Sequence, residues 1–172
     1  GADVIKVEKL PGGDDSRGYR EPRIDGVSAP YLVMNRNKRA MAINLKIREG
    51  KEVLLRMVKD TDVLIENYRV GTMEKIGLGY ETLAQVNPGL IYCAISGYGR
   101  TGPYANKGGF DLIAQGFAGL MSITGEPGGD PVKTGNSVAD ICAGILAATG
   151  ICAAYVHKLK TGKGQVVETS LM

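Results

Sequence analysis

Hydrophobic and polar residues alternate along the first half of the chain in short segments that predict strands and helices. The β-branched run 4–7 predicts a buried strand, and residues 41–45 predict a second, weaker strand. Apolar residues at helical spacing predict an amphipathic helix over 47–59. Residues 61–67 echo the opening of the chain and predict another strand. With the helix between them, the two similar strands predict a βαβ unit.

The second half of the chain continues this alternation, after a polar, turn-rich segment at 14–30. Helices are predicted at 72–76, 80–86, 110–123 and 138–159, and strands at 90–96 and 166–170. Strands that alternate with helices indicate an α/β domain with a mostly parallel sheet and flanking helices.

Composition is compatible with such a domain and excludes few partners. The 172 residues can bury one proper core. The sequence is 44% hydrophobic and 23% charged, which is ordinary for a globular protein. The net charge of +3 is too small to indicate a nucleic-acid partner, although it permits an anionic ligand.

Cysteine and histidine usage argues against a metal site. Cys93, Cys142 and Cys152 form no Cys-x-x-Cys pair, and the chain has one histidine. We therefore expect no bound metal and three buried, reduced thiols. Residues 139–155 come nearest to a membrane span, but Asp140 and many small residues argue against one. The expected location is cytoplasmic, or the mitochondrial or another organellar matrix in a eukaryote.

Two segments suggest phosphate binding without establishing it. Residues 97–102 read Gly-Tyr-Gly-Arg-Thr-Gly, which matches a dinucleotide fingerprint. However, further loop residues follow where a helix should begin, and no acidic residue ends a strand about 20 residues later. A mobile loop beside a ligand site is the preferred interpretation. Arg36, Lys38 and Arg39 form a basic cluster that fits either a solvated loop or a phosphate contact.

Asp140 is the most informative acidic residue in the sequence. It begins a predicted helix that is rich in Ala, Gly and Cys, where close approach of a ligand or neighbouring backbone is possible. Ser137 to Asp140 also has the spacing of a capping box, in which Asp140 would bond to the cap backbone. The helix dipole would favour the ionised carboxylate in either role. The residues alone leave both a helix cap and a nucleophile open.

Several segments together resemble the family III (CaiB/BaiF-type) CoA-transferases, a group that includes formyl-CoA transferases, carnitine CoA-transferases and 2-methylacyl-CoA racemases. The resemblance covers the whole chain. It is carried by residues 1–8, 35–39, 62–68, 97–99, 109–111 and 160–165. It implies the Rossmann-like large domain of that fold, of which residues 1–172 would be the central part. The smaller second domain would lie outside this chain, because the sequence begins and ends within predicted regular structure.

The resemblance also implies a catalytic residue and a ligand. Asp140 matches the family's nucleophilic aspartate, and coenzyme A or acyl-CoA is the implied substrate, with no permanently bound cofactor. The positions that match the CoA contacts are Lys9, Ile43, Lys46, Asn67, Tyr68 and Lys75, with Tyr98 beside the pantetheine arm or acyl group. The implied partners are acyl-CoA and carboxylic acids, and the full-length protein is expected to be an interlocked homodimer.

The implied reaction moves CoA to a carboxylic acid acceptor through an aspartyl mixed anhydride and an aspartyl-CoA thioester. Racemases of the group carry a histidine where this chain has Phe110, and phenylalanine cannot exchange protons. A transferase is therefore favoured over a racemase. A non-catalytic CoA-binding fragment is the remaining alternative.

Overall fold

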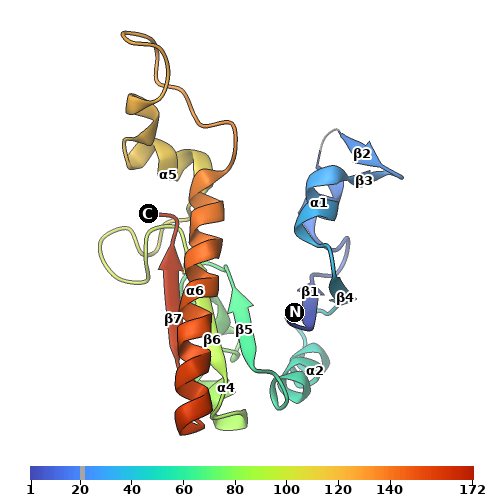
Figure 1. Ribbon diagram of the computed structural model, residues 1–172. Coiled ribbons are helices and arrows are strands. Elements are labelled where there is room, and N and C mark those ends of the chain that lie inside the picture. The colour runs from blue at the N-terminus through green and yellow to red at the C-terminus, as the bar shows by residue number, and fades with distance from the viewer. Residues whose placement is uncertain (20–21) are drawn as a thin grey trace. The chain divides into compact units, whose positions relative to one another are not determined.

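The computed structural model describes residues 1–19 and 22–172, which form two compact units over 1–54 and 55–172 (Figure 1). Both units are built around small parallel sheets that carry helices. The predicted α/β class with parallel strands and flanking helices is confirmed.

The first unit is built on a pair of parallel strands. Strand β1 (Val4–Glu8) pairs with β4 (Lys38–Ala42), with Val4 opposite Lys38. Between them lie η1 (Asp15–Gly18), the antiparallel pair β2 (Arg23–Ile24) and β3 (Val27–Ser28), and α1 (Ala29–Met34). The β2–β3 turn uses positive φ at Asp25 (51°) and Gly26 (78°), which matches the twist of a two-residue hairpin.

Three predictions about the first unit need correction. Strand β1 exists as predicted, but it is not buried: Val4 and Ile5 are exposed, and Glu8 is the buried residue of the strand. Strand β4 begins three residues before the predicted segment 41–45, because its register follows β1. The short elements of residues 14–30 were not predicted, since tertiary contacts and not local periodicity define them.

Helix α2 (Arg48–Val58) confirms the predicted amphipathic helix. The βαβ unit predicted around it would join strands of the two different units and stays a prediction. Strand β1 pairs with β4, while β5 (Val63–Glu66) pairs with β6 (Ile91–Ser96).

The second unit holds a parallel sheet in the order β5-β6-β7, where β7 is Val166–Ser170. The central strand β6 is buried from Ile91 to Ala94, as expected for a parallel strand with neighbours on both sides. Helices α3 (Thr72–Lys75) and α4 (Tyr80–Val86) connect β5 to β6. The connection from β6 to β7 contains α5 (Asp111–Phe117), η2 (Leu120–Ile123) and α6 (Val138–Thr161).

Helix α6 lies along β6 and β7 (Figure 1), and its small residues allow a close approach to the sheet. Ala143, Ala147 and Ala154 are buried. A Cβ added to Gly150 would lie 2.7 Å from Cγ1 of Val167, so a larger residue there would push the helix away. The predicted role of small residues in close packing is confirmed for this face of α6.

The remaining predicted helices agree with the structure except at residues 110–123. That segment is two helices, because Gly119 has φ 79° and ends the α-helical run before η2. Residues 97–102 lead into turns and not into a helix, which confirms that the dinucleotide-binding context is missing.

Helix α6 also bears on two expectations. By length and composition it could cross a membrane, with a mean hydropathy of 1.7 over an 18-residue window. That residues 139–155 do not form a membrane span stays a prediction, and in the structure the helix packs on a sheet. Cys93 is buried as predicted, but Cys142 and Cys152 are exposed because α6 buries its alanine face instead. All three thiols are free.

Candidate active site

Asp140 lies in the first turn of α6 and is exposed. Its backbone N–H points to Asp111, at 3.4 Å from Oδ1. Its carboxylate makes no hydrogen bond or ion pair with any residue in the described part of the chain. The carboxylate is thus available to a ligand, as a nucleophile needs to be.

The N-terminus of α6 is capped from another helix. Asp111, the first residue of α5, accepts a 2.8 Å hydrogen bond at Oδ1 from the N–H of Ala139. Ser137 makes no side-chain cap bond, so the predicted capping box is wrong. Asp111 instead binds the N–H groups of Ala139 and Asp140, two of the donors that the first turn of a helix leaves without a partner in the helix.

A buried amide holds Asp111 in this position. Gln115, with an exposed fraction of 1%, donates from Nε2 to Oδ2 of Asp111 at 2.5 Å. Its Oε1 accepts from the N–H and the hydroxyl of Thr134, at 2.9 and 3.1 Å. Sequence reasoning missed Gln115. Its i,i+4 spacing from Asp111 was the available signal, but that spacing does not reveal the loop contact.

The electrostatics of Asp140 differ from the expectation. Desolvation by neighbouring protein atoms, with repulsion from Asp111, raises the pKa of the Asp140 carboxyl. The helix dipole was expected to favour the ionised form, but a second carboxylate at the same terminus opposes it. A carboxylate with a raised pKa is more basic, and hence a better nucleophile once ionised.

The glycine loop after β6 packs against the segment that leads into α5. A Cβ added to Gly97 would lie 2.6 Å from Cα of Gly109, so this contact requires glycine. Phe110 follows as the exposed N-cap of α5. Tyr98 belongs to a ring cluster with Tyr104 and Phe117, with centroid distances of 5.3 to 5.6 Å.

Three predicted CoA contacts lie in the first unit. Lys9 is exposed and its Nζ lies 2.6 and 2.7 Å from the carboxylate oxygens of Asp15. Ile43 is buried, and its N–H bonds to the carbonyl of Glu8 at 2.9 Å. Lys46 is exposed, and its N–H bonds to Oδ1 of Asn44. Only the two lysines thus present a side chain to solvent.

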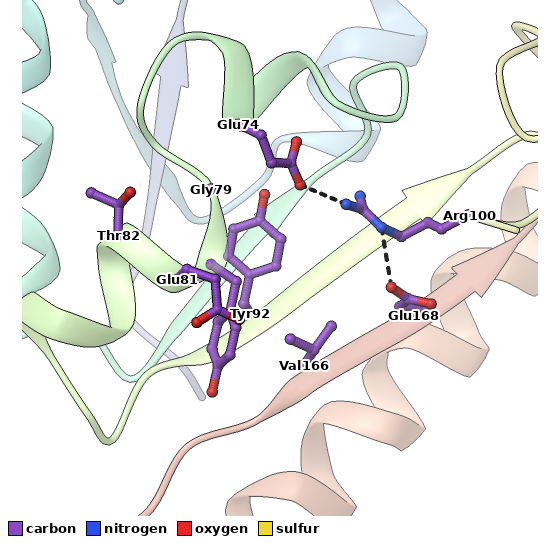
Figure 2. Close-up of a pocket in the computed structure, with 9 residues that line it drawn as sticks. Glu74, Gly79, Glu81, Thr82, Tyr92, Arg100, Val166 and Glu168 are labelled. Atoms are coloured by element: carbon purple, nitrogen blue, oxygen red, sulfur yellow. Dashed lines mark hydrogen bonds and ion pairs between the residues drawn. The ribbon is translucent and has the colours of Figure 1, made fainter.

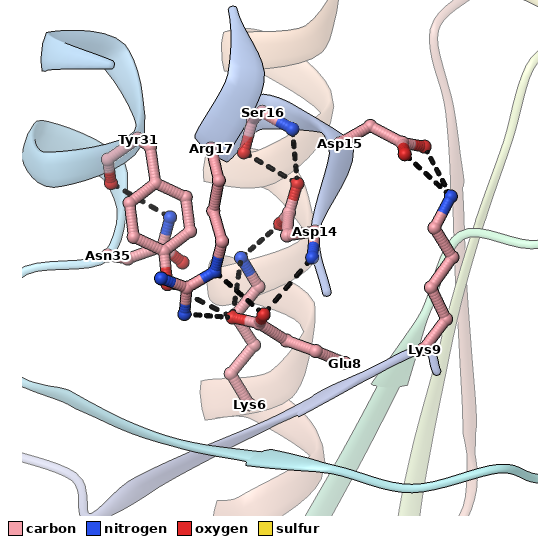
Figure 3. A network of polar contacts seen from close by, with 9 residues as sticks. All are labelled: Lys6, Glu8, Lys9, Asp14, Asp15, Ser16, Arg17, Tyr31 and Asn35. Carbon is pink, nitrogen blue, oxygen red and sulfur yellow. Dashed lines mark hydrogen bonds and ion pairs between the residues drawn. The ribbon is translucent and has the colours of Figure 1, made fainter. Parts of the chain in front are cut away.

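The loop that carries Lys9 is organised by Glu8 (Figure 3). The Glu8 carboxylate accepts two hydrogen bonds of 2.9 Å from Arg17 and one of 3.0 Å from the Tyr31 hydroxyl. It also accepts the N–H of Asp14, which itself pairs with Lys6. The Arg17 hydrogen bonds, despite the burial of Glu8, lower the pKa of its carboxyl to about 2.

The basic cluster of the sequence is not a loop in the structure. Lys38 and Arg39 begin β4, and Arg39 binds Asp3 with a distance of 3.1 Å from Nε to Oδ1. The solvated-loop interpretation is therefore wrong for these two residues, although both are exposed.

The other predicted contacts lie in the second unit. Asn67 and Tyr68 follow β5, Lys75 ends α3, and all three are exposed. The N–H of Tyr68 donates to Oε2 of the buried Glu66 at 2.7 Å, and this hydrogen bond holds the turn after β5 in place. The roles of these residues toward CoA stay predictions. No group of three potential metal ligands occurs among residues 1–19 and 22–172.

Known proteins align with the entire chain. The sequence profile described as CoA-transferase family III matches residues 1–172. A succinate–glutarate CoA-transferase of Agrobacterium fabrum is 46% identical, over 100% of this chain and 44% of its own length. The human succinyl-CoA:glutarate CoA-transferase is 41% identical, over 100% of this chain and 39% of its own length.

A solved structure leads to the same family. A CaiB/BaiF family protein from Brucella suis superposes with a TM-score of 0.94 at 43% identity, over 99% of this chain and 46% of that one. The chain thus spans less than half the length of these relatives. Its sequence and fold place it in CoA-transferase family III.

Proposed function

We propose that the protein containing this chain transfers CoA from an acyl-CoA to a carboxylic acid, with Asp140 as the nucleophile. The observation that carries the proposal is the free carboxylate of Asp140 at a helix terminus whose N–H groups are capped by Asp111. Asp111 thus caps the helix, and the Asp140 carboxylate is left to react. Membership of the CoA-transferase family supports the reaction class.

The names of the relatives support dicarboxylic acids as substrates. The Agrobacterium and human proteins are named for succinate or succinyl-CoA and for glutarate. We therefore take succinyl-CoA as the first donor to test and glutarate as the first acceptor.

The proposed mechanism balances without ATP or a metal. Asp140 attacks the thioester carbonyl, which forms a mixed anhydride and releases CoA thiolate. The thiolate attacks the aspartyl carbonyl, so an aspartyl-CoA thioester forms and the donor acid leaves. The acceptor carboxylate then attacks this thioester, releasing the thiolate again. Thiolate attack on the acceptor's carbonyl gives the new acyl-CoA and restores Asp140.

The residues proposed to contact CoA are those that match the CoA contacts of the family. Lys9, Lys46 and Lys75 supply cations for the phosphates, although a lysine contact lacks the bidentate geometry of arginine. Ile43, Asn67 and Tyr68 are proposed as neutral contacts. Tyr98 is proposed to lie along the pantetheine arm or the acyl group.

Phe110 favours transfer over racemisation, because its side chain has no proton to exchange at the N-terminus of α5.

A homodimer is proposed for the full-length protein. The exposed apolar residues of α6, among them Ile145, Leu146 and Leu159, support burial against further protein.

The test is a CoA-transfer assay with the full-length protein, succinyl-CoA and glutarate. We expect Asp140→Asn to lower kcat by about a thousandfold or more, because the amide cannot form the anhydride. Asp130→Asn changes an exposed loop carboxylate and is the matched control. Normal turnover by Asp140→Asn and Asp140→Ala would exclude the mechanism. Exchange of the α-proton with deuterium, without acyl exchange, would instead indicate a racemase.

A further inference from the structure

Arg100 binds three carboxylates that come from three different elements of the second unit. Figure 2 shows two of them, Glu74 and Glu168. Its Nη2 lies 2.6 Å from Glu74 of α3, and its Nε lies 3.1 Å from Glu168 of β7. Its Nη1 lies 3.6 Å from Glu66 at the end of β5. Arg100 itself stands on the glycine loop after β6, so one guanidinium joins four segments.

The segments that Arg100 joins carry the proposed CoA contacts of this unit. Glu66 precedes Asn67 directly, and its Oε2 also accepts the N–H of Tyr68 at 2.7 Å. Glu74 precedes Lys75 in α3. Tyr98 lies two residues before Arg100 on the same loop.

Arg100 is poorly placed to bind a phosphate itself. Its side chain is 19% exposed, and Nε, Nη1 and Nη2 each face a carboxylate. Three carboxylates around one cation leave a local excess of negative charge, which repels an anionic ligand. Arg100 and two of its partners, Glu74 and Glu168, line a pocket of about 350 Å³ whose wall also includes Tyr80 and Tyr92. An effect of Arg100 on CoA must therefore pass through the residues beside its partners.

We propose that Arg100 is a positioning residue for CoA binding: it fixes the end of β5, α3 and the glycine loop relative to one another. This inference rests on the proposed function. Lysine cannot replace it fully, because a single ammonium lacks the planar set of donors that reaches three carboxylates at once. The expected consequence of its loss is weaker binding of acyl-CoA with little change in the chemical step.

The test compares Arg100→Gln with Lys158→Gln in the full-length protein. Lys158 is the matched control, because its side chain is 20% exposed and its Nζ pairs with Asp62 at 2.7 Å across two elements. No proposed CoA contact adjoins either of those residues. We expect Arg100→Gln to raise KM for succinyl-CoA, and Kd for CoA by calorimetry, about tenfold, with kcat changed less than about twofold. Lys158→Gln should leave both constants unchanged.

Conservative variants keep the inference testable if Arg100→Gln does not fold. Arg100→Lys should give an intermediate KM, and Glu74→Gln, at a partly exposed partner, should raise KM about threefold. An unchanged KM in the Arg100 and Glu74 variants, with wild-type transfer intact, would overturn the inference alone. So would an equal rise in KM in Lys158→Gln. A wild-type protein that neither binds CoA nor transfers it would overturn the proposed function, and this inference with it.

Discussion

Glu8 and Glu66 end similar strands, β1 and β5, and are buried to the same extent, with 6% and 7% exposed. The pKa values of their carboxyl groups are nevertheless shifted in opposite directions. The Arg17 hydrogen bonds lower the pKa of Glu8 to about 2, while desolvation raises the pKa of Glu66. Arg17 binds Glu8 through two hydrogen bonds of 2.9 Å, whereas Arg100 lies 3.6 Å from Glu66 and is shared with Glu74 and Glu168. The two Arg17 hydrogen bonds thus outweigh the desolvation of Glu8, whereas desolvation outweighs the hydrogen bonds and the more distant Arg100 at Glu66.

The largest effect is expected from Glu8→Gln. An amide cannot accept both Arg17 hydrogen bonds, and the Tyr31 hydroxyl loses a charged acceptor. We expect the free energy of unfolding to fall by about 2 kcal/mol at pH 7, measured by urea denaturation. The loss should shrink as the pH falls from 4.5 toward 2, because Glu8 stabilises the folded state only while it is ionised. A loss that persists unchanged at pH 2 would contradict this account.

Asp111→Asn extends the comparison to a carboxyl group that helps to raise the pKa of another carboxyl group, that of Asp140. We expect about 1 kcal/mol of lost stability, because the charged cap of α6 becomes neutral. Removal of the Asp111 charge should also lower the raised pKa of Asp140, so the acidic limb of the pH–kcat profile should move to lower pH. Asp130→Asn is the control, and an acidic limb that stays in place would show that Asp111 does not act on Asp140.

Glu66→Gln should show that Glu66 at the end of β5 contributes less to stability than Glu8 at the end of β1. Because the pKa of Glu66 is raised above 4.5, its ionised form costs stability at neutral pH. We expect the amide to change stability at pH 7 by less than about 1 kcal/mol, since one oxygen still accepts the N–H of Tyr68. As the pH falls through the raised pKa, the wild type should gain stability relative to the variant. A loss as large as that of Glu8→Gln would show that Arg100 binds Glu66 as tightly as Arg17 binds Glu8.

The smallest effect on stability is expected from Asp15→Asn. Asp15 and Lys9 form an exposed pair in the same loop that Glu8 organises. Exposed ion pairs contribute little to stability. We therefore expect the free energy of unfolding, followed through the thermal midpoint, to change by less than about 0.5 kcal/mol. The variant frees Lys9 from its carboxylate, and KM for acyl-CoA should fall slightly if Lys9 binds a phosphate. A large stability loss would show that the pair is not merely a surface contact.

Elements with a clear hydrophobic periodicity were predicted from the sequence, whereas elements whose limits depend on tertiary contacts were missed or displaced. Helix α2 and strand β7 follow local patterns, and their positions were predicted closely. Strand β4 was displaced because its limits follow its pairing with β1. The predicted βαβ unit stays a prediction, because its two strands belong to different units and no local signal states which strand is the neighbour.

The sequence offered Asp140 as the reactive residue, which stays a prediction, and it missed the residues that support its position. Asp140 was identified through the family resemblance, since residue chemistry alone also allowed a helix cap. The cap comes instead from Asp111, which Gln115 holds in place. Such contacts join residues that lie far apart in sequence, as does the binding of Glu74 and Glu168 by Arg100. Pattern reading within one segment cannot reveal them.

The most direct test of the central claim is to trap the acyl-enzyme at Asp140. The full-length protein is incubated with succinyl-CoA, treated with hydroxylamine, digested and analysed by tandem mass spectrometry. The account predicts a hydroxamate on the peptide that contains Asp140, at that residue, and none in the absence of succinyl-CoA or in Asp140→Asn. A protein that transfers CoA while its Asp140 stays unmodified, or that carries the hydroxamate on another residue, would contradict it.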